Sequence, residues 1–168
     1  MRLLRAAFVV ALAAPALPAR ADDPPTIEHQ PVGCTLPGKA ISLCAAVADD
    51  AMVAKARAYF RPAEDKYYSY VEMSFGGITY CGTLPAPREG KLKTLEYYLQ
   101  AVDDQYQAQR TSTYQMQVQP EATCAFPPLE KDPTRAGAIK VFATHPKQGK
   151  KLAGEFDATG VTFVAVAR

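Results

Sequence analysis

Hydrophobic and polar positions alternate along much of this chain with a period of two residues, which is the pattern of β-strands. The segment 41–48 shows it clearly, because Ile41, Leu43 and Val47 alternate with smaller or more polar residues. Further segments share this period and end near Gly, Pro or Asp residues: 53–61, 67–75, 78–84, 95–101 and 111–119. The pattern therefore predicts an all-β fold.

One segment also fits a helix. Leu92, Leu95 and Leu99 have the spacing of a single helical face. Tyr97 and Tyr98, with turn residues on both sides, match the neighbouring strand segments better. We therefore predict a strand within 91–102 and keep a helix there as the alternative.

The last part of the chain has a different pattern. A proline-rich connector covers 121–137, and alternation returns in 139–145 and 161–167. The loop between these two expected strands is polar and contains Lys147, Lys150 and Lys151. Because so short a segment cannot form an independent core, we expect 121–168 to pack as a two-stranded extension on the body formed by 22–120.

The N-terminus has the three parts of a secretory signal peptide. Arg2 and Arg5 precede an uncharged segment, 6–17, and an Ala-x-Ala sequence ends at Ala21. We expect cleavage of residues 1–21 and export to the periplasm or the extracellular space. After residue 21, no segment contains the roughly 20 apolar residues that a membrane-spanning helix needs.

Removal of the signal segment changes the charge balance. That segment carries three of the 19 basic residues, which leaves 16 basic against 17 acidic residues in place of the formal net charge of +2. A chain with almost no net charge has no general attraction for nucleic acid or anionic lipid. We therefore expect no nucleic-acid partner.

The chain contains four cysteines, and an even number in an exported protein predicts two disulfides. From spacing alone, all three pairings of Cys34, Cys44, Cys81 and Cys124 are open. No two of them have the C-x-x-C spacing of zinc sites, and neither histidine has neighbours that resemble metal ligands. No cofactor is indicated, with calcium as the one exception considered below.

About seven short strands separated by turn residues are typical of a β-sandwich. Six stretches have the order expected of one particular kind: His29-Gln30-Pro31-Val32, Ile41-x-Leu43-x-Ala45-x-Val47-x-Asp49, Ala58-Tyr59-Phe60-Arg61, Val71-x-Met73, Tyr80-x-Gly82-x-Leu84-Pro85-Ala86-Pro87 and Glu96-Tyr97-Tyr98-Leu99-x-Ala101-x-Asp103. Over 27–119 the chain resembles the fibronectin type III and immunoglobulin-like domains of exported bacterial proteins. It has no Trp and no Cys in the strand of Tyr97, which favours the fibronectin type III branch.

The resemblance implies a disulfide pairing and a role for one tyrosine. In this topology the strands of Cys44 and Cys81 are neighbours, so a Cys44–Cys81 bridge is implied, which leaves Cys34–Cys124. Tyr97 would occupy a position like that of a tyrosine corner, with its ring in the core and its hydroxyl on the backbone.

The same topology places two loops with paired aspartates at one pole of the sandwich. Clustered carboxylates favour calcium, so this pole is a candidate calcium site formed by Asp49, Asp50, Asp103 and Asp104. The alternative is that these aspartates end strands because their side chains cap turns.

Alternation also predicts a set of aromatic and basic side chains on the outer face of one sheet: Arg57, Tyr59, Arg61, Tyr68, Tyr70 and Tyr98. Tyr and Arg are enriched at the energetically important positions of protein interfaces. This face is therefore a candidate binding site. Two alternatives are that the C-terminal strands cover it or that it is merely solvated.

Nothing in the sequence selects a catalytic site. There is no Gly-x-Ser-x-Gly motif, no phosphate-binding glycine loop, and no nucleophile with an evident base. We therefore expect a non-catalytic binding or structural module whose partner is an envelope protein, an extracellular protein or a polysaccharide. The alternatives are a carbohydrate-binding module that uses exposed tyrosines and an enzyme with an unrecognised carboxylate site.

Overall fold

The computed structural model describes residues 23–124 and 138–167, and these residues form an all-β protein with two packed sheets. The expected signal peptide, residues 1–21, lies outside the described residues. Apart from strands, the described residues contain two short 3-10 turns, Glu121–Thr123 and Pro146–Gln148.

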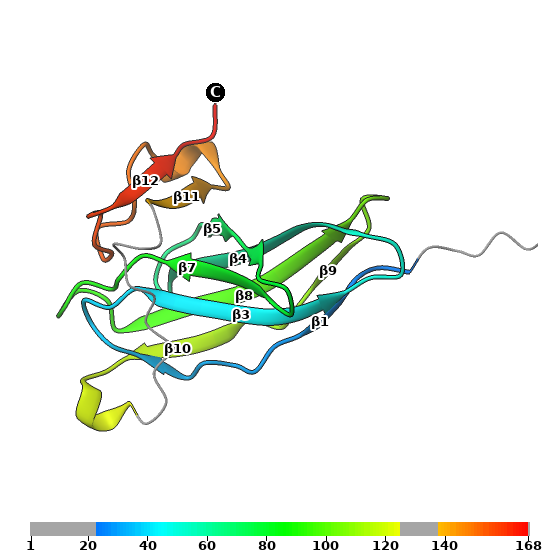
Figure 1. Ribbon diagram of the computed structural model, residues 1–168. Helices are drawn as coiled ribbons and strands as arrows, with labels where there is room; N and C mark the ends of the chain where they lie inside the picture. Colours follow the sequence, from blue (N-terminus) through cyan, green and yellow to red (C-terminus); the bar gives the residue numbers. More distant parts are fainter. Residues whose placement is uncertain (1–22, 125–137, 168) are drawn as a thin grey trace, which may run out of the picture.

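The smaller sheet has the strand order β1-β3-β7-β6, and each strand is antiparallel to its neighbours. Its strands are β1 (Thr26–Glu28), β3 (Ile41–Ala48), β7 (Tyr80–Leu84) and β6 (Ser74–Phe75). In Figure 1, β1, β3 and β7 form one layer in front of β4 and β8.

The larger sheet has the strand order β12-β11-β5-β4-β8-β10-β2. A further short strand, β9 (Ala108–Arg110), also pairs with β8. Its strands are β2 (Cys34–Thr35), β4 (Val53–Pro62), β5 (Ser69–Glu72), β8 (Thr94–Asp103), β10 (Tyr114–Val118), β11 (Ile139–Ala143) and β12 (Val161–Val164). The helical alternative for 91–102 is therefore wrong: β8 hydrogen-bonds to both β4 and β10 and becomes a central strand.

The segment 67–75 differs from the single strand that its pattern predicts. It divides at Met73, because the residues before it pair with β4 in the larger sheet and those after it pair with β7 in the smaller sheet. The chain thus changes sheets within a few residues, and Met73 remains buried at the crossing. A period of two does not reveal such a crossing, since both halves continue the alternation.

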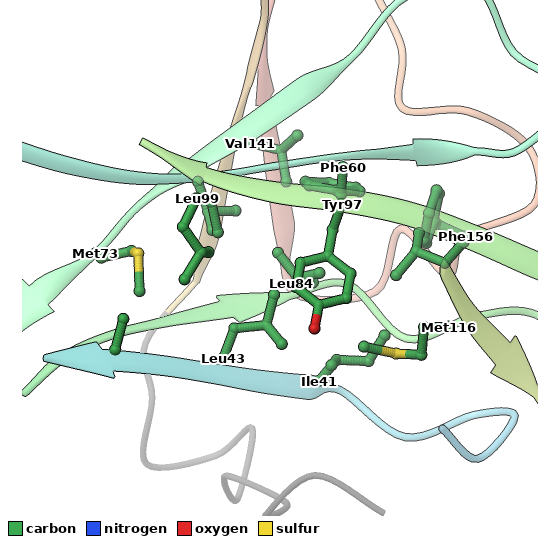
Figure 2. Close-up of a cluster of buried hydrophobic side chains, with 14 of the residues drawn as sticks. Ile41, Leu43, Phe60, Met73, Leu84, Tyr97, Leu99, Met116, Val141 and Phe156 are labelled. Atoms are coloured by element: carbon green, nitrogen blue, oxygen red, sulfur yellow. The ribbon is translucent and has the colours of Figure 1, made fainter. Parts of the chain in front are cut away.

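The core lies between the two sheets and is built by alternate residues of the long strands. In β8, buried and partly exposed residues alternate along the whole strand, so Leu95, Tyr97 and Leu99 face the smaller sheet. Ile41, Leu43 and other fully buried side chains meet them from the opposite side (Figure 2). Each large apolar side chain buried in this way contributes about 1.5 to 3 kcal/mol.

Tyr97 is fully buried in this core (Figure 2). Its hydroxyl is nevertheless hydrogen-bonded. The backbone N–H of Val32 donates to that hydroxyl across 2.8 Å, and Nε2 of His29 lies 3.0 Å from it. Burial raises the pKa of Tyr97 to about 12. The expected arrangement, a ring in the core with a hydroxyl on the backbone, is therefore observed.

Two disulfides are present, and they are the pairs that the resemblance implied. Cys44 and Cys81 are directly opposite each other on β3 and β7, with their Cα atoms 4.2 Å apart. The second bridge joins Cys34 of β2 to Cys124, with Cα atoms 5.7 Å apart. Disulfides of this kind persist in oxidising compartments, which agrees with an exported protein.

The C-terminal strands extend the larger sheet at its edge. β11 is antiparallel to β5 and parallel to β12, with Phe142 opposite Tyr70 (Figure 1). The loop between β11 and β12 returns to the body: Phe156 is 2% exposed, and its ring meets that of Phe60 edge to face at 5.3 Å. The extension therefore lies beside the aromatic face and does not cover it, unlike one of the alternatives considered from the sequence.

Candidate binding face

The six residues predicted for the outer face of the larger sheet lie on β4, on β8, and on or just before β5. Tyr59 is at the centre of this set. Its ring is stacked on that of Tyr98, with centroids 4.7 Å apart and planes within 5°, and it lies 5.3 Å from the ring of Tyr70. Tyr68 meets Tyr98 edge to face at 5.0 Å. The structure thus brings the predicted tyrosines into one cluster.

Strand register explains this cluster. Tyr59 is directly opposite Tyr70 on β5 and directly opposite Tyr98 on β8. Side chains of such cross-strand pairs are about 5 Å apart, so three aromatic residues in one row must pack against each other. Phe142 of β11 continues the row, because it is opposite Tyr70 and stacks on it at 4.9 Å.

Basic side chains lie over the rings of this row. The guanidinium carbons of Arg57 and Arg61 are each 4.5 Å from a ring centroid, that of Tyr70 and of Tyr68 respectively. The same arrangement is repeated by two further residues, Arg110 over Tyr98 at 5.0 Å and Lys140 over Phe142 at 5.1 Å. Cations in this position are attracted by the negative face of the ring.

Three members of the face, Arg110, Lys140 and Phe142, are not among the sequence predictions. Alternation within 139–145 does show that Lys140 and Phe142 share one side of a strand. What the sequence did not reveal is that this strand joins the edge of β5. Arg110 belongs to β9, a short strand that the pattern did not predict. We call these three residues together with the six predicted ones the aromatic–cationic face.

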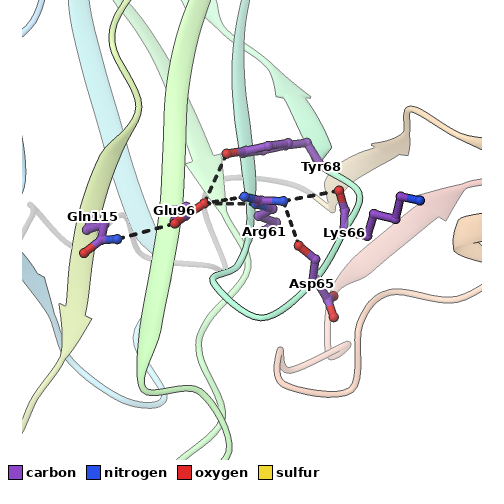
Figure 3. Close-up of polar contacts among 6 residues, drawn as sticks. All are labelled: Arg61, Asp65, Lys66, Tyr68, Glu96 and Gln115. Atoms are coloured by element: carbon purple, nitrogen blue, oxygen red, sulfur yellow. Dashed lines mark hydrogen bonds and ion pairs between the residues drawn. The ribbon is translucent and has the colours of Figure 1, made fainter.

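Arg61 is held by a network of polar contacts (Figure 3). Its Nη2 and Nε donate to Oε2 of Glu96 at 2.7 and 3.0 Å, and the hydroxyl of Tyr68 donates to the same oxygen at 3.3 Å. Hydrogen bonding from Arg61 lowers the pKa of Glu96, so this carboxylate is ionised at neutral pH. The charge of Arg61 is therefore largely compensated within the protein.

Arg57 is less fully paired. Its nearest carboxylate, Glu72, is 4.0 Å away and exposed, and its buried Nε has no hydrogen-bond partner. Arg110 and Lys140 have no ion pair with any described residue. The aromatic–cationic face thus has two cations without an ion pair among the described residues, and a third, Arg57, whose one ion pair is at 4.0 Å.

The packing of the rings decides what the face can offer. Because Tyr59, Tyr70 and Tyr98 have neighbouring rings or guanidinium groups over their faces, they present mainly edges and hydroxyls; Tyr59 is only 9% exposed. Burial raises the pKa of Tyr70 and of Tyr98, so both hydroxyls are protonated at neutral pH. The face therefore combines hydroxyl groups with cationic N–H donors.

The candidate calcium site is not formed by the described residues. No group of three or more acidic, histidine and cysteine side chains among them is arranged to hold a metal ion. Instead, Oδ1 of Asp49 accepts hydrogen bonds from the backbone N–H groups of Ala51 and Met52, and Oδ1 of Asp103 accepts one from Gln107. Asp49 and Asp103 thus cap the turns in which their strands end, which is the alternative given above, and Asp50 and Asp104 are exposed.

Both histidines have structural partners. Nδ1 of His29 is 2.8 Å from the carbonyl oxygen of Cys44, and its Nε2 contacts Tyr97. The ring of His145 stacks on Tyr67 at 4.2 Å, and its Nδ1 accepts a hydrogen bond from the backbone of Lys147. These contacts position β1 and the loop after β11 respectively.

Comparisons with protein-family models, with curated proteins and with solved structures find no match to this chain. In the part of the chain that the structure describes, no helix has the length and apolar character needed to cross a membrane.

Proposed function

We propose that this protein is an exported, non-catalytic binding module and that the aromatic–cationic face is its recognition surface. The observation that carries the proposal is the continuous row of rings across β11, β5, β4 and β8 with a cation over each of several rings. Aromatic and Arg side chains bury a large area at low entropic cost, which makes such a surface suited to a protein partner.

Charge defines the chemistry of that partner. Arg57, Arg110 and Lys140 supply three cations on this face, and the exposed carboxylate of Glu72 lies 4.0 Å from Arg57. An acidic surface on the partner would pair with these cations and would accelerate the association of the two proteins. The proposed partner is therefore an acidic protein surface in the periplasm or the extracellular space.

A fibronectin type III-like identity is part of the same proposal. The partition of the body into a β1-β3-β7 sheet and a β5-β4-β8-β10 sheet supports it. The short edge strand β6, the parallel strand β2 and the extension β11-β12 are additions to that scheme. Recognition through one rigid sheet face needs no rearrangement of the loops.

The carbohydrate-binding alternative receives less support from the face. A sugar ring stacks on an aromatic ring whose own face is free. In this row the faces are occupied by neighbouring rings and by guanidinium groups. A sugar would have to displace those contacts before it could bind.

The test is capture by crosslinking in the native envelope, with charge-matched variants. The double variant Arg57→Gln/Arg110→Gln removes two cations from the face, and Lys91→Gln/Lys93→Gln removes two exposed cations elsewhere. We expect the first variant to lose the crosslinked partner and the second to retain it. The partner should also dissociate at high salt, because the proposed contacts are between surface charges.

Two results would contradict the proposal. Equal capture by both double variants would show that the face is not the contact surface. Salt-insensitive retention on cell-wall polysaccharide, lost in Tyr98→Ala but kept in Arg57→Gln/Arg110→Gln, would select the carbohydrate alternative. Urea unfolding of each variant would establish that the comparison is made between folded proteins.

A further inference from the structure

A cavity of about 330 Å³ lies beside the aromatic–cationic face, with which it shares only Arg61, between the body and the C-terminal extension. One wall is formed by residues 60–69, at the end of β4 and the beginning of β5. The other wall is formed by residues 147–163, mostly the long loop between β11 and β12. Two segments that are far apart in sequence thus enclose it.

The cavity has an apolar part supplied by both walls. Phe60, Leu152, Phe156 and Phe163 line it. A second hollow of about 580 Å³ is also bordered by Leu152, Phe156 and Phe163, so these side chains separate two open spaces. Phe60 and Phe156 are almost fully buried, so Leu152 and Phe163, which are partly exposed, supply the apolar surface that a ligand can contact.

The polar part of the lining is strongly biased in charge. Four basic residues, Arg61, Lys66, Lys147 and Lys151, line the cavity with one acidic residue, Asp65. Arg61 is paired with Glu96, but the three lysine ammonium groups have no ion pair with any described residue. Lys66 lies over the ring of Tyr67, and Lys147 and Lys151 are exposed. The lining thus has more basic than acidic side chains, while Glu155 and Glu64 lie close enough to Asp65 to contribute to its raised pKa.

Hydrogen bonds hold both walls in place. Nη1 of Arg61 donates to the backbone oxygens of Asp65 and Lys66 at 2.8 and 3.2 Å, which fixes the turn after β4 (Figure 3). On the opposite wall, the side-chain oxygen of Gln148 accepts hydrogen bonds from the backbone N–H groups of Thr144 and His145. The side-chain nitrogen of Gln148 donates to Ser69 and joins the two walls. The cavity is therefore preformed.

We propose that this cavity binds a small organic anion. Its apolar body lies against Leu152 and Phe163, and its carboxylate, sulfonate or phosphate group meets the ammonium groups of Lys147 and Lys151. The volume falls within the roughly 300 to 1,000 Å³ of small-molecule sites, which combine apolar walls with a few polar groups. Charge-assisted hydrogen bonds from ammonium to an anionic oxygen supply the orientation.

The experiment uses anilinonaphthalene sulfonate as the probe, because it joins an aromatic body to one anionic group. Fluorescence titration of the exported chain should give saturable binding at one site. Lys147→Gln/Lys151→Gln should weaken that binding about tenfold, since each ion pair near a surface contributes up to about 1 kcal/mol. Lys55→Gln, at the far end of β4, is the matched control and should bind as the unmodified protein does.

Further measurements locate the bound probe and distinguish its apolar contacts from its ion pair. Uncharged anilinonaphthalene should bind the double variant and the unmodified protein equally, because its body keeps the same apolar contacts. Amide chemical shifts in nuclear magnetic resonance spectra should change with the sulfonate probe at Ser69, Gln148 and Ala153. Inorganic phosphate alone should displace the probe poorly, since it lacks the apolar body.

The proposal is overturned if the probe shows no saturable binding, or if the double variant binds it as tightly as the unmodified protein. It is also overturned if the shift changes fall on the aromatic–cationic face. It is likewise overturned if the double variant loses the uncharged compound in parallel, because the two lysines would then not act through an ion pair with the anionic group. Lys147 and Lys151 lie outside the aromatic–cationic face, so partner capture by this variant stays a separate observation.

Discussion

Tyr97 and His29 share a hydrogen bond of 3.0 Å that joins the core of the sandwich to the segment after β1. The carbonyl oxygen of Cys44 can only accept, so the proton of the imidazole lies on Nδ1. Nε2 is then an acceptor, and the hydroxyl of Tyr97 donates to it while accepting from the N–H of Val32. The pair is satisfied in this way only when His29 is neutral.

Removal of the Tyr97 hydroxyl should destabilise the protein without changing its fold. Tyr97→Phe leaves the N–H of Val32 and Nε2 of His29 without their partner in a partly buried setting. We expect the free energy of unfolding in urea to fall by about 1 to 3 kcal/mol. Tyr106→Phe is the matched control, because Tyr106 is 90% exposed. An equal loss in both variants would mean that the hydrogen bonds of Tyr97 do not matter.

Stability should decrease as the pH falls below about 6.5, the ordinary pKa of histidine. Burial lowers the pKa of His29 in the folded protein, partly opposed by its hydrogen bond to Cys44. The unfolded chain therefore takes up this proton at a higher pH than the folded protein does. The stability that neutral His29 contributes is fully present above the ordinary pKa of histidine. It is lost as the pH falls through the pKa that His29 has in the folded protein.

The pH effect is measured as the urea midpoint at a series of values between about pH 7.5 and 5. His29→Gln should lose the part of the pH dependence of stability that falls between about pH 6.5 and 5, whereas Tyr106→Phe should keep it. The pKa of Glu96 and that of Asp157 are both lowered, so their contributions disappear only at more acidic pH. A pH dependence that His29→Gln leaves unchanged would refute the assignment.

Both disulfides should stabilise the fold, and the longer loop should contribute more. The separations of 90 residues for Cys34–Cys124 and 37 for Cys44–Cys81 correspond to about 4.6 and about 3.8 kcal/mol in a chain-entropy estimate. Paired Cys→Ser variants of each bridge should therefore lower the melting temperature. A thiol count on the unmodified, denatured protein should find no free cysteine; four reactive thiols would contradict the bridges.

The pKa of Glu96 should depend on Arg61. Hydrogen bonding from Arg61 holds that pKa below its usual range, so Arg61→Met should raise it. Since the pKa is lowered on folding, the carboxylate contributes stability above its ordinary pKa and loses that contribution as the pH falls. Carboxyl titration by nuclear magnetic resonance measures the effect. Arg57→Met, which leaves the Arg61–Glu96 pair intact, should leave the titration midpoint of Glu96 in place.

The C-terminal extension should unfold together with the body. Phe156→Ala removes a buried ring that packs against Phe60, and we expect a loss of about 3 to 5 kcal/mol. Val166→Ala, near the exposed end of the chain, should change stability very little. A nearly unchanged unfolding midpoint for Phe156→Ala would mean that the extension is an independent unit.

Local alternation predicted most strands of this protein and the side on which their residues lie. Ile41 and Leu43 are buried as expected, whereas Cys44 points outward and pairs with Cys81. The tyrosines predicted for the outer face also lie there together. Such predictions succeed because side chains of successive strand residues point to opposite faces whatever the strand pairs with.

Strand partners were much harder to predict, since pairing joins residues that are distant in sequence. Nothing local to Phe142 indicates that its strand joins β5 and places the ring on Tyr70. In the same way, the paired aspartates lie at one end of their strands without forming a cluster of ligands. Oδ1 of Asp49 and Oδ1 of Asp103 each cap a turn, whereas Oδ2 of each is buried without a hydrogen-bond partner. The sequence alone did not decide between capping and calcium.

The sequence by itself determined that this chain forms a disulfide-bonded β-sandwich, because a period of two and four cysteines are properties of the chain read in order. Only the tertiary structure decided where 67–75 changes sheets, which edge receives the extension, and that a basic cavity opens between the extension and the body. Those features depend on strand register and on contacts between residues that are distant in sequence. The energy of packing, and not the local pattern, decides which strands pair there.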